Sequence, residues 1–291
     1  MQILEVLEKF VIQLEADGRG WSIIGQYRRH VGLLDRWLAT GNRSRKVADL
    51  THEVLAGFLA SPDARLRPDG VQKKATSMNV LRGSLKSFSR YAFLAGHVAL
   101  DPGRMMHRAR CGHPPPRWLA QEEANQLLAT IATERSSIAK RDLIFVQLLL
   151  GTGVRLSTAL ALRSQDVDVT RRLLVLREMK GNAPDMLPIS VTVAAMLQTY
   201  LQDRPPGPLF EGEKGRPLGR RQAARRLEIW GERAGLVGRV HAHALRHSFA
   251  RRLYEKTGDV LTVQALLRHR SIASTMIYAK VDLRDLRRAL A

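Results

Sequence analysis

The chain has few cysteines, no long apolar run and few acidic residues. Cys111 is its only cysteine, so no disulfide can form within the chain, and we expect a reducing compartment, the cytoplasm. No stretch approaches the roughly 18 consecutive apolar residues that cross a bilayer. The first residues, MQILEVLEKFVIQLE, carry acids where a signal peptide is basic. These absences argue against secreted and membrane-spanning classes of protein.

Acidic residues are too few to balance the basic ones. Lys and Arg number 47 against 27 Asp and Glu, which gives a formal net charge of +20. Such a surplus indicates a polyanionic partner, because cationic side chains that neutralise phosphates release counterions. Charged residues make up 25% of the chain, an ordinary level, so we expect the basicity on folded surfaces rather than in a disordered tail. With 291 residues the chain is long enough for two domains.

Residues 1–100 show the apolar spacing of helices. Stripes that begin at Leu4, Trp21 and Val54 predict three helices, and a fourth runs from about Gln72 to Ala95 and ends at Gly96. The basic residues on and before this fourth helix form either a solvated face, which is the usual explanation of such a row, or candidate contacts to backbone phosphates of a nucleic acid. They are Lys73, Lys74, Arg82, Lys86 and Arg90.

Residues 101–118 read as a basic linker, which the run Pro114-Pro115-Pro116 stiffens. His107, Cys111 and His113 lie close together in it, but no fourth ligand stands at a suitable spacing, so we assign no metal.

Residues 119–291 form the second predicted domain. Ile138–Leu150 is nearly all apolar and predicts a buried helix, and Val191–Leu201 predicts another. Apolar and polar residues alternate around Lys180-Gly181-Asn182, which predicts a β-hairpin. An arginine-dense helix is the element that we expect to enter a DNA groove, although a charged surface gives the same pattern. Its basic residues are Arg220, Arg221, Arg225 and Arg226.

The stretch from His241 to Tyr278 gathers chemistry that suits a phosphodiester. His243, Arg246 and His247 fall at i, i+3 and i+4 of a predicted helix that ends at Gly258, so their side chains meet. A guanidinium binds phosphate oxygens, an imidazole moves protons near neutrality, and a phenol attacks when its surroundings are cationic. Together these groups predict attack on a phosphodiester that leaves a phosphotyrosine.

At these residues the chain resembles the tyrosine recombinases, the phage-integrase and Xer-like family. HALRH resembles the family's H-x-x-R box, and LLRHRSIASTMIY resembles the segment that places His269 nine residues before a nucleophilic Tyr278. Gly151-Thr152-Gly153-Val154-Arg155-Leu156-Ser157 resembles its T-G-x-R-x-S box, and Lys180 falls where the family keeps a lysine on a β-turn. A helical bundle in which Tyr278 is merely buried is the alternative for this stretch.

The resemblance implies a role for each matching residue. Arg155 and Arg246 bind the non-bridging phosphate oxygens with His269, Lys180 protonates the leaving 5′-oxygen, His243 accepts the phenol proton, and Tyr278 is the nucleophile. His247 is treated as a structural neighbour. The sequence departs from the family at Thr158, where many relatives have glutamate, and at Ala183-Pro184-Asp185, where basic residues often follow the lysine turn.

The fold class that we expect is mainly α with a small antiparallel β-sheet in the catalytic domain, arranged as a two-domain C-shaped DNA clamp. By resemblance, residues 1–100 are a helical core-binding (SAM-like) DNA-binding domain and 119–291 are the catalytic domain. The expected function is site-specific recombination in an Xer-like or mobile-element setting, with a dimer on one double-stranded DNA site and a tetramer at the synapse. We expect no membrane, ATP or metal requirement, and a nucleoid-associated cytoplasmic location.

Three other functions compete with this interpretation. The first is a non-catalytic DNA-binding or architectural protein on the same scaffold. Such a protein would tend to lose some of the catalytic residues, whereas this chain has the full set. A topoisomerase-like relaxer keeps the chemistry but not the strand exchange. A metal-dependent nuclease is the weakest of the three, because Asp166 and Asp168 lack a third matching carboxylate.

Overall fold

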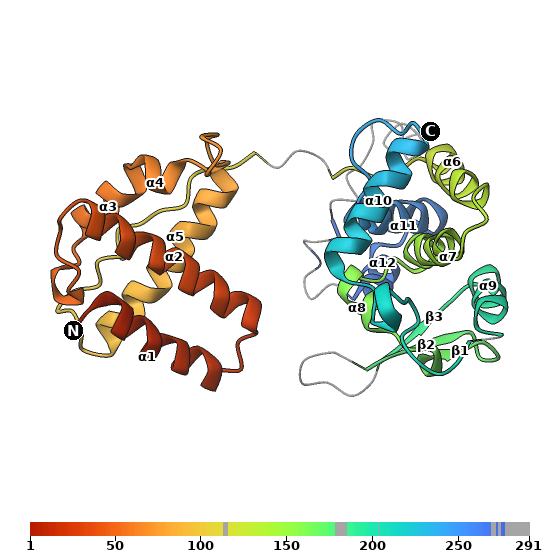
Figure 1. The fold of residues 1–291 in the computed structure, drawn as a ribbon, viewed down its shortest axis with the longest axis horizontal. Coiled ribbons are helices and arrows are strands. Elements are labelled where there is room, and N and C mark those ends of the chain that lie inside the picture. The colour runs from red at the N-terminus through yellow and green to blue at the C-terminus, as the bar shows by residue number, and fades with distance from the viewer. Residues whose placement is uncertain (113–115, 178–184, 203, 269–271, 273–274, 277–291) are drawn as a thin grey trace. The chain divides into compact units, whose positions relative to one another are not determined.

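A computed structural model describes residues 1–112, 116–177, 185–202, 204–268, 272 and 275–276 of the chain. It divides into two compact units, Met1–His113 and Pro114–Ala291, each with its own hydrophobic core (Figure 1). The division falls inside the predicted linker. Within the described ranges, none of the helices is both long and apolar enough to cross a membrane.

The first unit is built mainly from helices. Its elements are α1 (Ile3–Ala16), α2 (Trp21–Thr40), the 3₁₀ turn η1 (Val47–Asp49), α3 (His52–Ala60), α4 (Pro62–Arg65) and α5 (Ala75–Leu94). The helix α2 packs against both α1 and α5. Phe10 of α1 makes ring contacts with Tyr27 of α2 and Phe88 of α5, which places these aromatic side chains where the three helices meet.

Two residues of the predicted apolar stripes lie on the wrong face. Leu4 is 39% exposed and Trp21 is 79% exposed, whereas Ile3 and Val6 are buried. Ile3 and Leu4 are consecutive apolar residues, so the spacing alone did not determine which of them faces the core. Helix α5 begins three residues after the predicted start, at Ala75, with Lys74 as its N-cap.

The second unit is mainly helical with one small sheet, as the sequence predicts. Its helices are α6 (Gln121–Ala132), α7 (Ser137–Thr152), α8 (Leu156–Ala161), α9 (Val191–Leu201), α10 (Arg220–Arg233), α11 (Ala242–Thr257) and α12 (Val260–Leu267), with 3₁₀ turns η2 (Ser164–Asp166) and η3 (Glu213–Gly215). The bounds of α9 match the predicted ones.

The sheet is antiparallel and has the order β1-β2-β3. Its strands are β1 (Val167–Asp168), β2 (Leu173–Leu176) and β3 (Asp185–Pro188). Leu174 pairs with Leu187 and Leu176 pairs with Asp185, so β2 and β3 form the predicted hairpin around the segment that contains Lys180. The turn itself lies outside the described residues.

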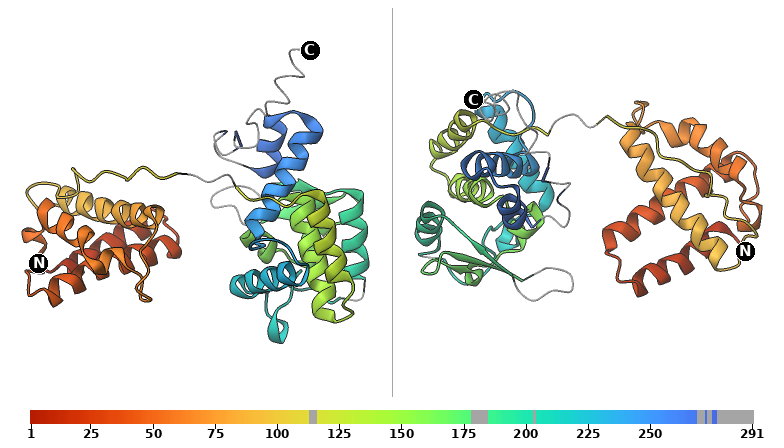
Figure 2. Two further views of the ribbon diagram at one scale, coloured as in Figure 1. Left: turned by 90° about the horizontal axis from the view of Figure 1, so that it is seen from above. Right: turned by 180° about the vertical axis from the view of Figure 1, so that it is seen from behind.

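The buried helix α7 is the centre of this unit, with α6, α9 and α11 packed around it (Figure 2). Leu148 and Leu149 of α7 are fully buried, as its apolar sequence predicts. Helix α11 ends at Gly258, whose φ of +64° is the left-handed conformation that glycine adopts without strain. The chain then continues through α12, whose last residue Leu267 lies beside Gly153 at the C-terminal end of α7.

Candidate active site

The turn between α7 and α8 carries Arg155 and depends on a glycine. Gly153 has a φ of +61°, and a Cβ placed on it would lie 2.4 Å from a ring carbon of Phe249 and 2.9 Å from a methyl carbon of Leu267. Any side chain at this position is therefore excluded by both backbone and space. The tight turn brings the Gly153 carbonyl beside α11 and leaves Arg155 exposed at the N-cap of α8.

The Arg246 guanidinium joins this turn to the end of α12. Arg246 is only 5% exposed on α11, and it donates hydrogen bonds to the carbonyl oxygens of Gly153 and Leu267. Arg155 contacts the same end of α12, because its Nη2 donates to the carbonyl oxygen of Arg268 at 3.2 Å. The two arginines come from boxes far apart in the sequence, and the fold brings them to one place.

A small pocket lies where these elements meet. It is lined by Val154, Arg155, Thr158, Leu176, Leu187, Arg246, Leu266, Leu267 and Arg268. The lining combines three arginines with apolar side chains that include Leu176 of β2 and Leu187 of β3. Such a lining suits an anion, because guanidinium groups fork onto anionic oxygens and the apolar side chains partly exclude water.

His243 lies one helical turn before Arg246 on the same helix. Its ring meets the buried His247 ring edge to face, with centroids 4.3 Å apart, as the i, i+4 spacing predicts. The His243 side chain is exposed in part and buried in part. Partial burial lowers its pKa below the usual 6.5, and the positive charges of Arg246, His241 and Arg155 lower it further. The imidazole is therefore neutral at neutral pH and able to accept a proton.

Three predicted catalytic residues, Lys180, His269 and Tyr278, lie outside the described residues. Their neighbours in the chain are described. Lys180 belongs to the connection between β2 and β3, and His269 directly follows Arg268 of the pocket.

The arginines predicted on α10 differ in their surroundings. Arg220, Arg221 and Arg225 are exposed. Arg226 donates from Nε to Asp142 at 2.5 Å, and its side chain is 23% exposed. The Arg226 guanidinium is thus engaged by the protein, while the other three face outward.

Asp142 is an anchoring residue that the sequence reasoning missed. It is 1% exposed, and its carboxylate accepts hydrogen bonds from Arg141, Arg226 and the Trp230 ring nitrogen, which join α7 to α10. The sequence feature that could have identified it is the Arg141-Asp142 pair within a mostly apolar helix. A carboxylate buried in such a helix requires hydrogen-bond donors from elsewhere in the fold.

The basic residues of the first unit also differ in their surroundings. The Lys73 ammonium donates to the Ala64 carbonyl at 2.7 Å, and Lys86 donates to the Met106 carbonyl at 3.2 Å. Lys74 and Arg90 are exposed. A groove of about 390 Å³ separates α5 from the linker, and it is lined by Arg82, Gly83, Lys86, Ser87, Met106, His107 and Arg108.

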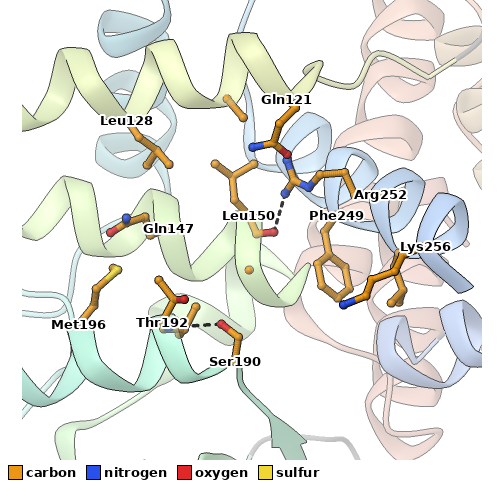
Figure 3. Close-up of a pocket in the computed structure, with 14 residues that line it drawn as sticks. Gln121, Leu128, Gln147, Leu150, Ser190, Thr192, Met196, Phe249, Arg252 and Lys256 are labelled. Atoms are coloured by element: carbon orange, nitrogen blue, oxygen red, sulfur yellow. Dashed lines mark hydrogen bonds between the residues drawn. The ribbon is translucent and has the colours of Figure 1, made fainter.

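A larger open groove of about 510 Å³ lies between α6, α7, α9 and α11 (Figure 3). Leu128, Met196 and Phe249 give it an apolar lining, and Gln121, Arg252 and Lys256 lie toward one end. Arg252 is held there by a hydrogen bond to the Leu150 carbonyl at 2.8 Å. This groove shares no lining residue with the pocket of Arg155 and Arg246.

Comparison with protein families matches residues 117–284 to the phage integrase family. Tyrosine recombinase XerA of Thermococcus kodakarensis is 32% identical over 290 residues, covering 98% of this chain and 94% of the relative. Tyrosine recombinase XerC of Chromobacterium violaceum is 30% identical over 286 residues, covering 97% and 92%.

Solved structures share the fold. The XerH site-specific recombinase bound to its difH substrate, a pre-cleavage complex, has a TM-score of 0.73 at 24% identity and covers 98% of this chain and 83% of that one. A lambda integrase dimer bound to a COC′ core site has a TM-score of 0.73 at 18% identity, with coverage of 97% and 81%.

Proposed function

Because this chain belongs to the phage integrase family and is a tyrosine-type site-specific recombinase, we propose that it cuts and rejoins DNA through a 3′-phosphotyrosine at Tyr278. The observation that carries this proposal is the convergence of Arg155 and Arg246 in one pocket beside a histidine that is neutral at neutral pH. Tyr278 follows in the same C-terminal stretch.

In the proposed reaction the Tyr278 hydroxyl oxygen attacks the scissile phosphorus and His243 accepts its proton. The bond from phosphorus to the 5′-oxygen breaks, and Lys180 gives that oxygen a proton. Arg155, Arg246 and His269 stabilise the charge on the non-bridging oxygens of the pentavalent transition state. In the second half of the reaction a 5′-hydroxyl from another strand attacks the phosphotyrosine and releases Tyr278.

The exposed arginines of α10 and the groove beside α5 are the proposed DNA-contacting surfaces. The exposed Arg220, Arg221 and Arg225 are proposed to enter a groove of the duplex. The residues proposed to contact the backbone phosphates are Lys74, Arg82, Lys86 and Arg90. The first unit is the proposed core-binding domain, and we propose that both units contact double-stranded DNA.

Strand exchange between two sites requires four active sites, so we propose a dimer on each site and a tetramer at the synapse. The family resemblance implies that the C-terminal segment 282–290 docks on a neighbouring protomer, with packing on its own domain as the alternative. We propose the groove between α6, α7, α9 and α11 as the surface that receives it. The full-length similarity to XerA and XerC favours an Xer-like role in the cytoplasm, with a mobile-element enzyme as the second possibility.

The test of this proposal is covalent capture on nicked DNA. A nick a few nucleotides to the 3′ side of the scissile phosphate lets the short fragment with the free 5′-hydroxyl diffuse away after cleavage. Without that hydroxyl the phosphotyrosine cannot be reversed, so the protein stays attached to the DNA. The wild-type protein is expected to form this adduct, and Tyr278→Phe is expected to bind DNA with unchanged affinity and form none. An adduct with Tyr278→Phe would remove Tyr278 from the reaction, and a wild-type protein that binds without forming an adduct would favour the architectural alternative.

A relaxer is distinguished by synapsis. The proposed recombinase joins two DNA sites in one complex and exchanges their strands. A protein that cleaves and reseals one site without pairing two sites would be topoisomerase-like.

A further inference from the structure

Arg268 adopts a backbone conformation that suits glycine. It is the C-cap of α12 with φ 54° and ψ 49°, the left-handed region. The caps of α7 and α11 have the same conformation and are glycines, Gly153 and Gly258. A side chain in this region is strained, and such strain persists only when surrounding contacts hold the residue in place.

The Arg268 side chain makes contacts that explain why an arginine stands there. Its Nη2 lies 2.9 Å from an Asp185 carboxylate oxygen and donates to the Met186 carbonyl at 2.7 Å. Both partners belong to the start of β3. The Arg268 side chain is 16% exposed and the Asp185 side chain is 47% exposed, so water screens this ion pair on its Asp185 side.

The Arg268 backbone touches the arginine centre directly. Its carbonyl oxygen accepts the hydrogen bond from Arg155, and the carbonyl of the preceding Leu267 accepts one from Arg246. Arg268 therefore connects the two proposed phosphate-binding arginines with the strand that leads out of the Lys180 connection.

We propose that Arg268 and Asp185 form a clamp that fixes the start of β3 relative to Arg155 and Arg246, and that both are positioning residues for the cleavage step. The clamp rests on the proposed function, because it acts by placing the strand next to the proposed general acid, Lys180. The clamp also explains why position 185 is acidic in this chain, although basic residues often follow the lysine turn in the family.

The variant Arg268→Gly tests the clamp without strain in the backbone, because glycine accepts the left-handed conformation. We expect its thermal stability and DNA affinity to match the wild type and its single-turnover cleavage rate to fall about 10- to 100-fold, the range expected when a reacting group is misplaced. Asp185→Asn is expected to show the same loss. Arg172→Gly is the matched control, since exposed Arg172 also has a left-handed φ of 54°, and its rate is expected to be unchanged.

The double variant Arg268→Gly/Asp185→Asn shows whether the two residues act as one unit. If they do, the double variant cleaves no more slowly than the slower single variant. Losses that multiply in the double variant would mean that the residues act independently, and would overturn the clamp.

A substrate with sulfur in place of the bridging 5′-oxygen separates positioning of Lys180 from general damage. A thiolate leaves without a proton because thiols are far more acidic than alcohols, so this DNA removes the need for a general acid. We expect it to restore most of the rate to Lys180→Ala, Arg268→Gly and Asp185→Asn. Rescue of Lys180→Ala alone would overturn the clamp; no rescue of Lys180→Ala would instead overturn the proposed role of Lys180, and the double variant would then decide on the clamp.

Discussion

At the scale of single residues, the proposed chemistry depends on His243 being neutral when Tyr278 attacks. Partial burial and the nearby Arg246, His241 and Arg155 lower the pKa of His243 below 6.5. A general base works only in its unprotonated form, so the cleavage rate is expected to stay level near neutrality. It should fall as the pH drops through the lowered pKa of His243.

The measurement is the single-turnover cleavage rate between pH 5 and pH 8 for the wild type and His243→Gln. We expect the variant to be slower by about 10²-fold or more and to lack the acidic fall, since a general base typically contributes 10²–10⁴. His247→Gln is the control on the same helix face. An acidic fall that persists in His243→Gln would assign the titration to another group.

A second histidine makes a prediction about stability. His30 of α2 is half-buried, with its Nδ1 2.8 Å from the Ser84 hydroxyl of α5, and burial followed by the charges of Arg29 and Lys73 lowers its pKa to about 4. Below pH 6.5 the unfolded chain takes up a proton that the folded chain refuses, so the free energy of unfolding falls between pH 6.5 and pH 4. Urea unfolding at pH 7 and pH 5 should show a loss about 1 kcal/mol larger for the wild type than for His30→Gln, after allowance for partial exposure. Equal losses would contradict the assignment.

At the scale of elements, α10 has one anchored face and one open face. The buried carboxylate of Asp142 binds Arg226 and Trp230, whereas Arg221 and Arg225 are exposed. Arg225→Ala is therefore expected to keep the stability of the protein and lower the slope of log affinity against log salt by about 1, the value for one lost phosphate contact.

Arg226→Ala is the matched variant on the anchored face. It removes one donor from a buried carboxylate, so unfolding should become easier by about 1–3 kcal/mol. The salt slope measured on the folded fraction should not change. A stable Arg226→Ala with a reduced slope would show that Arg226 contacts DNA and that the anchor is unimportant.

The sequence predicted most elements well because apolar periodicity and capping residues act locally. The bounds of α9, the end of α11 at Gly258 and the pairing of β2 with β3 all follow from neighbouring residues. It assigned Leu4 to the core wrongly, because only packing against other helices decides which of two adjacent apolar residues is buried. It also assigned Trp21 to the core wrongly, since this first residue of α2 lies exposed.

The site could be predicted only in part. The boxes around Arg155 and Arg246 are each contiguous in sequence, so motif spacing predicts both as candidates, and the structure brings them together in one pocket. The pairs Asp142–Arg226 and Arg268–Asp185 join residues that are 84 and 83 positions apart in the sequence. No local sequence pattern identifies such partners, so these pairs could not be predicted.

At the scale of the whole molecule, two compact units and a net charge of +20 suit a protein that holds DNA with one unit and cleaves it with the other. The phage integrase match begins at residue 117, at the start of the second unit, and the pocket of Arg155 and Arg246 lies within that match. The reaction needs no external energy in this account, because the phosphotyrosine retains the energy of the broken phosphodiester.

Identification of the residue that carries the DNA tests this account most directly. Wild-type protein is incubated with a nicked recombination site in EDTA and in magnesium, and the covalent adduct is digested and sequenced by mass spectrometry. The account predicts equal amounts of adduct under both conditions, with a 3′-phosphate linked to Tyr278. Attachment at another residue, or cleavage that occurs only with magnesium and leaves no covalent adduct, would contradict it.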